Sequence, residues 1–353
     1  MIESVHTAEM SPTYQTPSDL DAVLKDSFRY GSSLLNQRPK QKGNAYLLGY
    51  PIKHSLAPTL HNTLFDLRRL PWTYHRLESK EKQDLVNLLS QPESVGAAVT
   101  MPHKVSFIPL VDDLTEEARG IGAINTVFIR LDNSGKRKYI GTNTDTVGIR
   151  ESFLRNSTPD QLKRGKGSPG LVIGAGGACR SAIYALHHWL HVDEIYIVNR
   201  LQSEVEEIIS SFSKVSSFKA KLRFVGSPDE AKSLPAPFFV VGTVPDFPPQ
   251  TDGEKIARQC IEALMTRSDE SQGVVLEMCY HPTTRTSFAV FTENAGWKVI
   301  PGTEPMIWQG IAQQVLWTES GKLVNESEYQ KIEKVIEAGL AAHSPRTDTK
   351  SSL

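Results

Sequence analysis

The sequence predicts an α/β protein of two domains. Its 353 residues are enough for about two domains of ordinary size. Short apolar runs alternate with amphipathic stretches in two series, one beginning near Ala45 and the other near Gly170. This alternation is typical of parallel sheets that are covered by helices on both faces. A glycine-rich turn early in the second series indicates that this half binds a nucleotide.

The expected organisation has five segments. They are an N-terminal extension (1–44), a substrate-binding catalytic domain (45–150), a dinucleotide-binding domain (151–300), C-terminal helices (301–343) and a flexible tail (344–353). Residues 1–18 and 344–353 are rich in Ser, Thr, Pro and Lys and are expected to be mobile. Between Ser18 and Asn36 the apolar spacing predicts an accessory helix.

Composition limits the classes of partner. The chain has 39 basic and 40 acidic side chains, which gives no general attraction to nucleic acid or to an acidic membrane. No stretch reaches the roughly 20 apolar residues that span a bilayer, and residues 1–17 lack the apolar core of a secretion signal. Three widely spaced cysteines favour neither a disulfide framework nor a zinc site. We therefore expect a cytoplasmic protein with no metal, membrane or nucleic-acid partner.

The first series contains apolar strands at 45–49, 72–77 and 95–100, with helices after Pro58 and over 105–110. We expect a parallel sheet. Polar clusters follow or separate these elements, and strands that run in parallel would bring them to one crevice. The clusters are Lys53–Pro58, Val99–Lys104, Gly122–Thr126 and Gly141–Asp145.

The second series begins with a buried strand at 170–173, followed by a glycine-rich turn and a helix from about Arg180 to Leu190. The first glycine permits a tight turn, the second permits close approach of a pyrophosphate, and the helix N-terminus faces the anion. This is a Rossmann-type site. Its residues are Gly174, Ala175, Gly176, Gly177 and Ala178, with Cys179 at the third glycine position. Further strands are predicted at 194–198, 238–241 and 273–276, and 156–168 is predicted to be a polar linker or loop.

The end of strand 194–198 bears on the choice of nucleotide. An acidic residue there would bind the ribose 2′-hydroxyl of NAD, whereas an arginine accepts the 2′-phosphate of NADP. The chain has Asn199-Arg200, followed by Leu201 and Glu204. Arg200 favours NADP, although a solvated surface arginine is the alternative interpretation. Leu201 and Glu204 weaken or oppose the preference, so the sequence leaves NAD and NADP open.

Hydride transfer to a ketone produces an alkoxide, which needs a proton or a cation close by. Lys104 with Asp145 is a candidate pair for this task. A surface ion pair is the alternative interpretation of the same two residues.

Taken together, these motifs resemble the shikimate/quinate dehydrogenase family over about Ala45 to Thr318. The matching runs occur in family order: Gly49–Asn62, Val99–Lys104, Gly122–Thr126, Asn143–Asp145, the glycine-rich turn, Asn199-Arg200, Tyr280–Pro282, Gln309 and Trp317.

The resemblance implies a role for each matching position. Lys104 and Asp145 would be the catalytic pair, and Ser55 would bind the substrate carboxylate. Thr100, Asn125 and Gln309 would bind ring hydroxyls or orient the lysine, and Tyr280 would lie near substrate and nicotinamide. The family's Asn-Ala-Thr run appears here as Val241-Gly242-Thr243, and Thr243 would lie on the nicotinamide side. Because Gln309 comes late in the chain, the C-terminal helices should fold back onto the first domain.

The chain departs from the family at the substrate side. Ala57 replaces a second serine or threonine that would bind the carboxylate, and the loss of such a donor costs about 1.5–3 kcal/mol. Other departures are Ala98, Thr146 and Glu277. Shikimate, quinate and a related polyhydroxy acid therefore all remain candidate substrates. The protein is expected to be a monomer or a homodimer. A sensor that binds the acid or the dinucleotide without turnover is the alternative from another class, and retention of Lys104 and Asp145 counts against it.

Several conspicuous side chains are interpreted as packing or capping residues rather than as ligands or nucleophiles. They are His54, His61, Cys179, Cys279, Trp308 and Trp317.

Overall fold

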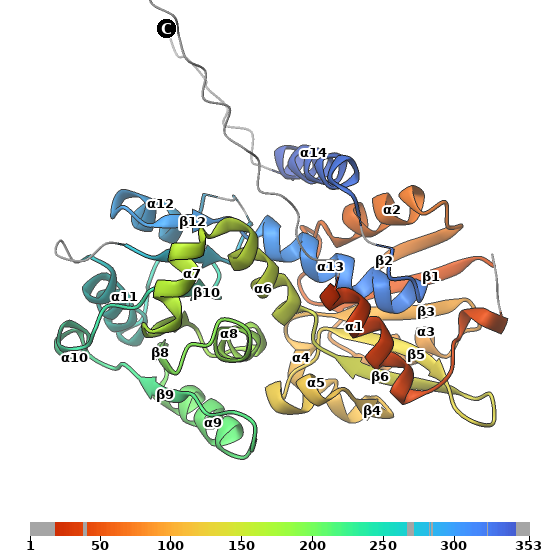
Figure 1. Cartoon of the computed structure of the whole chain (residues 1–353), viewed down its shortest axis with the longest axis horizontal. Helices are drawn as coiled ribbons and strands as arrows, with labels where there is room; N and C mark the ends of the chain where they lie inside the picture. Colours follow the sequence, from red (N-terminus) through yellow and green to blue (C-terminus); the bar gives the residue numbers. More distant parts are fainter. Residues whose placement is uncertain are drawn as a thin grey trace, which may run out of the picture.

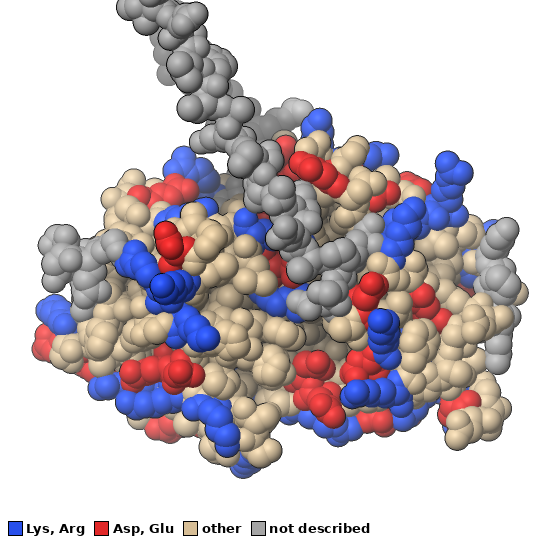
Figure 2. Space-filling model, in the orientation of Figure 1, with Lys and Arg blue, Asp and Glu red and all other residues tan. Residues whose placement is uncertain are grey.

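The computed structural model describes residues 18–37, 41–266, 272–281, 283, 285–322 and 324–343. The chain forms two halves, each built around a six-stranded sheet (Figure 1). The predicted tails lie outside the described residues, apart from Ser18. Basic and acidic side chains are interspersed over the face shown in Figure 2. None of the described helices is both long enough and apolar enough to cross a membrane.

The first sheet is mixed rather than parallel. In sheet order its strands are β2 (Trp72–Glu78), β1 (Gly43–Gly49), β3 (Ser94–Val99), β5 (Thr126–Leu131), β6 (Arg137–Thr142) and β4 (Asp113–Leu114). The helices of this half are α2 (Ala57–Leu67), α3 (Lys82–Leu89), α4 (His103–Ser106) and α5 (Glu116–Ile121). The 105–110 segment forms only the end of α4 and a 3-10 turn at Ile108–Leu110.

The expectation of a parallel first sheet was wrong because β5 and β6 form a hairpin. β5 runs antiparallel to both β3 and β6. The turn that joins them is built on Asp132, whose carboxylate accepts from the amides of Ser134 (2.8 Å) and Lys136 (2.9 Å), while Gly135 has a φ of +79°. So short a connection can join only antiparallel strands. Two reversals leave β6 parallel to β3, so the carboxyl ends of β1, β3 and β6 still meet at one edge.

The second sheet is wholly parallel. Its order is β12 (Lys298–Ile300), β11 (Val274–Glu277), β10 (Phe239–Gly242), β7 (Gly170–Ile173), β8 (Glu194–Val198) and β9 (Lys221–Phe224). This is the strand order of a Rossmann sheet. Its helices are α7 (Pro159–Lys166), α8 (Gly177–His188), α9 (Gln202–Ser213), α10 (Pro228–Ser233), α11 (Asp252–Met265) and α12 (Ser287–Asn294). Val172 packs with α8 and α9 on one face, and Leu171 and Ile173 pack with α10 to α12 on the other.

Two helix predictions in this half need correction. The predicted linker at 156–168 contains α7, which begins with a capping box formed by Thr158 and Gln161 around Pro159. The Thr-Pro-Asp-Gln run is a helix-start signal that the basic composition of the segment concealed. Helix α8 begins at Gly177, three residues before the predicted start, because the glycine turn itself leads into its first turn.

Two long helices join the halves. α6 (Asp145–Asn156) contacts α13 (Thr303–Thr318) and α8, so the predicted boundary at residue 150 falls inside a helix. α6 and α13 approach closely at Gly148, where a Cβ would lie 2.5 Å from the carbonyl oxygen of Pro305. α13 then crosses to α2 and β5, and α14 (Glu326–His343) packs on α2. The prediction that the C-terminal helices return to the first domain is confirmed.

The N-terminal extension is not one helix. α1 (Ser18–Ser27) is followed by 3-10 turns at Phe28–Tyr30 and Leu35–Gln37. Between those turns Ser32 pairs with Leu131 at the end of β5, through hydrogen bonds of 2.8 and 2.9 Å. Pairing with a residue so distant in sequence breaks the helical path predicted to reach Asn36. α1 itself packs on α13 (Figure 1).

A buried ion pair fastens this extension. Arg130 of β5 is 1% exposed and pairs with Glu319 at the end of α13, at 3.2 Å. Arg130 also donates to the hydroxyl of Ser27 (2.6 Å), and Glu319 accepts from Ser33 and from the amide of Leu34 (2.8 Å). Burial lowers the pKa of Arg130 to about 10, and the adjacent Glu319 opposes that shift. The guanidinium is therefore charged at neutral pH, and one charge pair joins three segments of the chain.

Candidate active site

The predicted polar clusters converge at one edge of the first sheet. Lys53–Pro58 follows β1, Val99–Lys104 follows β3, and Asn143–Asp145 follows β6. Asn125 immediately precedes β5, which runs the other way, so it reaches the same edge. The mixed sheet thus brings together side chains that we had expected a parallel sheet to collect.

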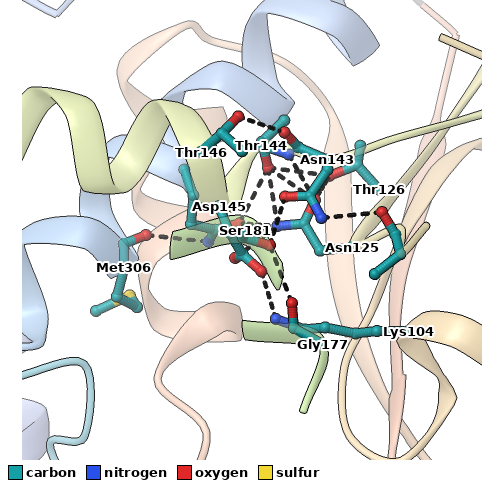
Figure 3. Close-up of polar contacts among 12 residues, drawn as sticks. Lys104, Asn125, Thr126, Asn143, Thr144, Asp145, Thr146, Gly177, Ser181 and Met306 are labelled. Carbon is teal, nitrogen blue, oxygen red and sulfur yellow. Dashed lines mark hydrogen bonds and ion pairs between the residues drawn. The ribbon is translucent and has the colours of Figure 1, made fainter. Parts of the chain in front are cut away.

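Lys104 and Asp145 form the centre of this edge (Figure 3). The Lys104 ammonium contacts the Oδ2 atom of Asp145, and the two side chains are 16% and 9% exposed. Oδ1 of Asp145 accepts a 2.8 Å hydrogen bond from Nδ2 of Asn125. Asp145 is also the first residue of α6, where the helix dipole favours a negative charge. The ammonium is therefore held by a carboxylate that is itself fixed on two sides.

A network of neutral polar groups supports Asn125. Its Oδ1 atom accepts from the amide of Thr144 and from the hydroxyl of Thr126, both at 2.7 Å. Its Nδ2 atom lies 3.2 Å from Oε1 of Gln309 on α13. Gln313, one turn further along α13, donates to Thr126 at 2.9 Å. Two sides of the amide are thus satisfied within the protein, which fixes the orientation of the nitrogen toward Asp145.

The glycine-rich turn has the geometry that a dinucleotide requires. Gly174 has a φ of +113°, and a Cβ there would lie 2.6 Å from the hydroxyl oxygen of Thr243. Nothing lies within 4 Å of the Cβ position of Gly176, the residue that caps α8. A left-handed residue followed by an open glycine at a helix N-terminus leaves backbone amides accessible to a pyrophosphate. The residues present therefore fit a dinucleotide.

The turn touches the lysine directly. A Cβ on Gly177, the first residue of α8, would lie 3.0 Å from Cβ and 3.1 Å from Cδ of Lys104. A second contact connects the same two regions, because the Ser181 hydroxyl on α8 donates to Oδ1 of Asn143 at 3.1 Å. Asn143 in turn donates to the carbonyl of Ala123 at 3.0 Å. The start of the nucleotide-binding helix is thereby fixed beside the Lys104–Asp145 pair.

Ser55 and Tyr280 form a separate contact between the halves. The Tyr280 hydroxyl hydrogen-bonds the Ser55 side chain and the backbone of Leu56; burial raises the pKa of Tyr280, and these bonds oppose the rise. Ser55 Oγ also accepts from the amide of Ala57 at 3.3 Å. Thr100 lies nearby in sequence to Lys104, but its methyl group packs at Gly49, and it takes no part in the Asn125 network.

Acidic groups lie at the end of β8, where the sequence is expected to choose between NAD and NADP. Asn199 donates to the carboxylate of Glu204 on α9 at 2.7 Å. Arg200 pairs with Glu254 of α11 at 3.0 Å. Hydrogen bonds from Thr251 and Gln250 and the contact with Arg200 lower the pKa of Glu254 to about 2. Arg200 therefore already has an anionic partner, and Glu204 places a second carboxylate beside Asn199.

Glu277 is a buried carboxyl at the end of β11, and it is 3% exposed. It accepts from the amide of Cys279 at 2.8 Å and from the hydroxyl of Thr286 at 3.3 Å. Burial raises its pKa from 4.5 to about 7, which these hydrogen bonds oppose and the charge of Asp246 reinforces. The folded protein thus binds a proton that the unfolded chain releases at lower pH.

We expect Glu277 to make stability fall as the pH rises. Between pH 4.5 and 7 the folded state holds more protons at this site than the unfolded state, so the free energy of unfolding decreases by roughly 3 kcal/mol and stays lower above pH 7. Glu277→Gln removes the proton exchange. Urea unfolding of both proteins from pH 4.5 to pH 8 should show the variant gaining stability relative to the native chain as pH rises; parallel curves would contradict the prediction.

The side chains interpreted as packing residues lie as expected. His61 is buried and stacked on Tyr74 with ring centroids 4.3 Å apart, and burial lowers its pKa to about 3, so it is neutral. Cys179 is fully buried, and burial raises its pKa to about 12. The remaining members pack against the core or a neighbouring loop: His54 on His281, Cys279 on Val244, and the buried Trp308 and Trp317. Among the described residues no group of three or more His, Cys, Asp or Glu could hold a metal ion.

Sequence reasoning missed several members of the site network. Thr144 lies within a motif that was recognised, yet its hydroxyl bonds Asn125 rather than capping α6. Ser181 and Gln313 lie on helices and contact residues 38 and 187 positions away. No local pattern marks either residue.

A Rossmann sheet whose glycine turn contacts a lysine–carboxylate pair on a second α/β half defines a dinucleotide-dependent dehydrogenase. Comparison with known proteins identifies which dehydrogenases these are. The family model described as the shikimate dehydrogenase substrate binding domain matches residues 47–127. The quinate dehydrogenase of Emericella nidulans is 41% identical over 315 residues, which cover 86% of this chain and 95% of the relative.

Solved structures agree. The dehydroquinate dehydratase and shikimate dehydrogenase AroM of S. pombe is 32% identical, with a TM-score of 0.66 over 88% of this chain; the chain spans 56% of that larger protein. Shikimate dehydrogenase of Aquifex aeolicus is 27% identical, with a TM-score of 0.64 over 84% of this chain and 98% of its own. The chain belongs to the shikimate/quinate dehydrogenase family, and the predicted fold class and enzyme class are confirmed.

Proposed function

We propose that the chain interconverts shikimate or quinate and the corresponding 3-dehydro ketone, with NAD or NADP as the second substrate. The contact of Lys104, paired with Asp145, against Gly177 of the dinucleotide turn carries this proposal. This contact supports the proposal because a nucleotide bound at the turn would lie close to a group that can transfer a proton. The alternative of a sensor without turnover has no comparable support, because a protein that only binds the acid has no need of proton transfer by Lys104 and Asp145.

The residues divide the reaction between them. During reduction the Lys104 ammonium donates a proton from Nζ to the carbonyl oxygen of the ketone and becomes a neutral amine. During oxidation the neutral amine takes the proton of the reacting hydroxyl at Nζ and becomes the ammonium again. Asp145 holds the ammonium in position, and Asn125 fixes Asp145. Bound NAD(P) supplies the carbon that accepts or returns the hydride. Gly174 to Ala178 and Thr243 would hold that nucleotide.

The substrate carboxylate would bind at Ser55, beside Tyr280. Gln309 and Thr100 remain our candidates for the ring hydroxyls. Gln309 combines a role in the Asn125 network with a position on α13 beside the site.

Of the two acids, we expect quinate to be the preferred substrate. Ala57 is 9% exposed and leaves the carboxylate region without the second hydroxyl donor of the family pattern. Quinate carries an additional hydroxyl on the carboxylate-bearing carbon, and a small residue gives that group room. The relative that is 41% identical is a quinate dehydrogenase.

We expect kcat/KM for quinate to exceed that for shikimate by about tenfold, since one hydrogen bond contributes about 0.5–1.5 kcal/mol net. Ala57→Ser should reduce the ratio by restoring a carboxylate donor at little change in volume. The measurement is kcat/KM for both acids with both nucleotides. An unchanged ratio in the variant would remove Ala57 from the explanation, and an absence of turnover with every combination would overturn the reaction.

We also propose that NAD is preferred over NADP. A 2′-phosphate at the end of β8 would meet the carboxylates of Glu204 and Glu254, and Arg200 is already paired. Glu204→Gln should raise kcat/KM for NADP by about tenfold, because it removes one like charge a few ångströms from the phosphate. Glu206→Gln, on the same helix and bonded to Gln202, is the matched control and should change nothing. Equal use of both nucleotides by the native chain would contradict the proposal.

A further inference from the structure

A cavity of about 490 Å³ lies behind the catalytic residues, and the proposed reaction makes no use of it. Its lining includes neither Lys104, Asp145 nor Ser55. On α6, Thr146, Val147 and Arg150 line it, and at about 100° per residue they lie on the side of the helix opposite Asp145. The volume is within the range of small-molecule sites, about 300–1,000 Å³.

The N-terminal extension forms one wall of the cavity. α1 contributes Val23, Lys25 and Ser27, among others, across from the residues of α6. Two contacts fix the position of this segment. Ser27 accepts a hydrogen bond from the buried Arg130, and Ser32, five residues later, pairs with Leu131. One wall of the cavity is therefore a segment held in place by hydrogen bonds to the Arg130–Glu319 pair and to the end of β5.

The floor of the cavity is polar and offers both donors and acceptors. Thr142, Asn143, Thr144 and Thr146 line it and are all buried. The hydroxyl of Thr146 donates to the carbonyl of Asn143 at 2.9 Å, which leaves its lone pairs as acceptors. Nδ2 of Asn143 donates to Ala123, which uses one of its two hydrogens. Neighbouring donors and acceptors suit ligand hydroxyl groups, since each hydroxyl both donates and accepts.

The walls and the charges restrict the occupant further. Val23, Phe128, Val147 and Leu316 supply apolar surface for a carbon ring. Two of the three cations in the lining are already paired. The charged groups of the lining are Lys25, Arg29, Arg150, Asp26 and Glu117. Arg29 pairs with Asp26 at 2.8 Å, and Arg150 pairs with Glu151 at 2.8 Å. Lys25 has no ion-pair partner among the described residues, which makes it the group to meet an anion.

We propose that this cavity is a second binding site, for a small, ring-bearing, hydroxylated monocarboxylate. A ligand in this cavity would affect turnover because Asn143 and Thr144 line the cavity and also belong to the hydrogen-bond network of the active site. Asn143 fixes Ser181 at the start of α8, and Thr144 bonds Asn125, which holds Asp145. A ligand that displaces or tightens these two residues acts on the catalytic pair without touching the substrate.

Amide hydrogen exchange of the full-length protein tests the site, because α1 takes no part in the proposed active site. Quinate serves as the anionic polyol and inositol as an uncharged polyol. We expect saturating quinate to slow exchange in 18–27 by about tenfold and inositol to leave it unchanged. Ala22→Trp, which puts a bulky ring on the α1 wall of the cavity, and Lys25→Glu should each abolish the effect on 18–27. Lys214→Glu, an exposed reversal on α9, should preserve it.

Each outcome decides between the two proposals. Protection by quinate at 53–58 and 100–104 but not at 18–27 would overturn the second site and leave the reaction standing. Protection at 18–27 alone would support the second site and count against the proposed substrate. Equal protection of 18–27 by inositol would overturn the assignment to a carboxylate. Retention of the effect in both α1 variants would place the ligand elsewhere and overturn the site.

Discussion

Replacing Lys104 with methionine is expected to lower kcat by about 100-fold or more, the contribution of a well-placed proton-transferring group. Methionine retains the aliphatic stem that packs on Gly177 but removes the ammonium that contacts Asp145. Lys104→Ala should show the same loss of kcat. Because the nucleotide binds mainly through the backbone of the turn, its Kd should change little. Steady-state kinetics with quinate, together with nucleotide titration, measure the two quantities.

The chain offers a matched control in the same half. Lys138 pairs with Asp113 at 2.8 Å, and the two side chains are 32% and 25% exposed, so Lys138→Ala removes an ion pair at the surface. Its kcat should stay within about twofold of the native value, as expected for a pair of this kind. A Lys104 variant that turns over at nearly the native rate would refute the assignment of the catalytic pair.

The second large effect concerns stability rather than turnover. Glu319→Gln leaves the Arg130 guanidinium, 1% exposed, without its carboxylate. Removing one partner of a buried pair typically costs about 3–5 kcal/mol, because the other charge remains buried and uncompensated. We expect the free energy of unfolding in urea to fall by that amount. Glu262→Ala breaks an exposed pair with Arg258 and should change it by less than about 0.5 kcal/mol.

A double variant separates charge from packing. Arg130→Met combined with Glu319→Gln removes both members of the pair, so no isolated charge remains in the core. It should be more stable than Glu319→Gln alone, as non-additive coupling between contacting residues requires. If the double variant is less stable by the sum of the two single losses, the ion pair is not the reason that the extension stays in place.

The parts of the fold that follow from local patterns were predictable. The strand at Glu194–Val198 and the glycine turn after Ile173 depend on residues within about ten positions of each other. The hairpin between β5 and β6 was not predicted, although Asp132 and Gly135 form a recognisable turn. Arg130 and Lys138 interrupt the two strands, so neither strand is a continuous apolar run.

Long-range pairing accounts for the rest. The accessory helix ends at Ser27 because the backbone of Ser32 pairs with Leu131. No pattern in the sequence near Ser32 predicts that contact. The same holds within the site. Lys104, Asn125 and Asp145 follow or precede strands and could be named from motif and topology. Ser181 and Gln313 could not be predicted from the sequence. Each is a polar residue on a helix, and its role depends on a hydrogen-bond partner far away in the sequence.

The position of α6 has a mechanical consequence. Asp145 stands at one end of the helix that links the halves. Ser181 bonds Asn143, two residues before Asp145, and Gly177 packs on Lys104, the ion-pair partner of Asp145. A rotation of the two halves about a pivot near those contacts would move Lys104 and Asp145 very little relative to each other. The same rotation would open the separate contact between Ser55 and Tyr280, so the acid that we propose as substrate would enter and leave there while Lys104 and Asp145 stay together.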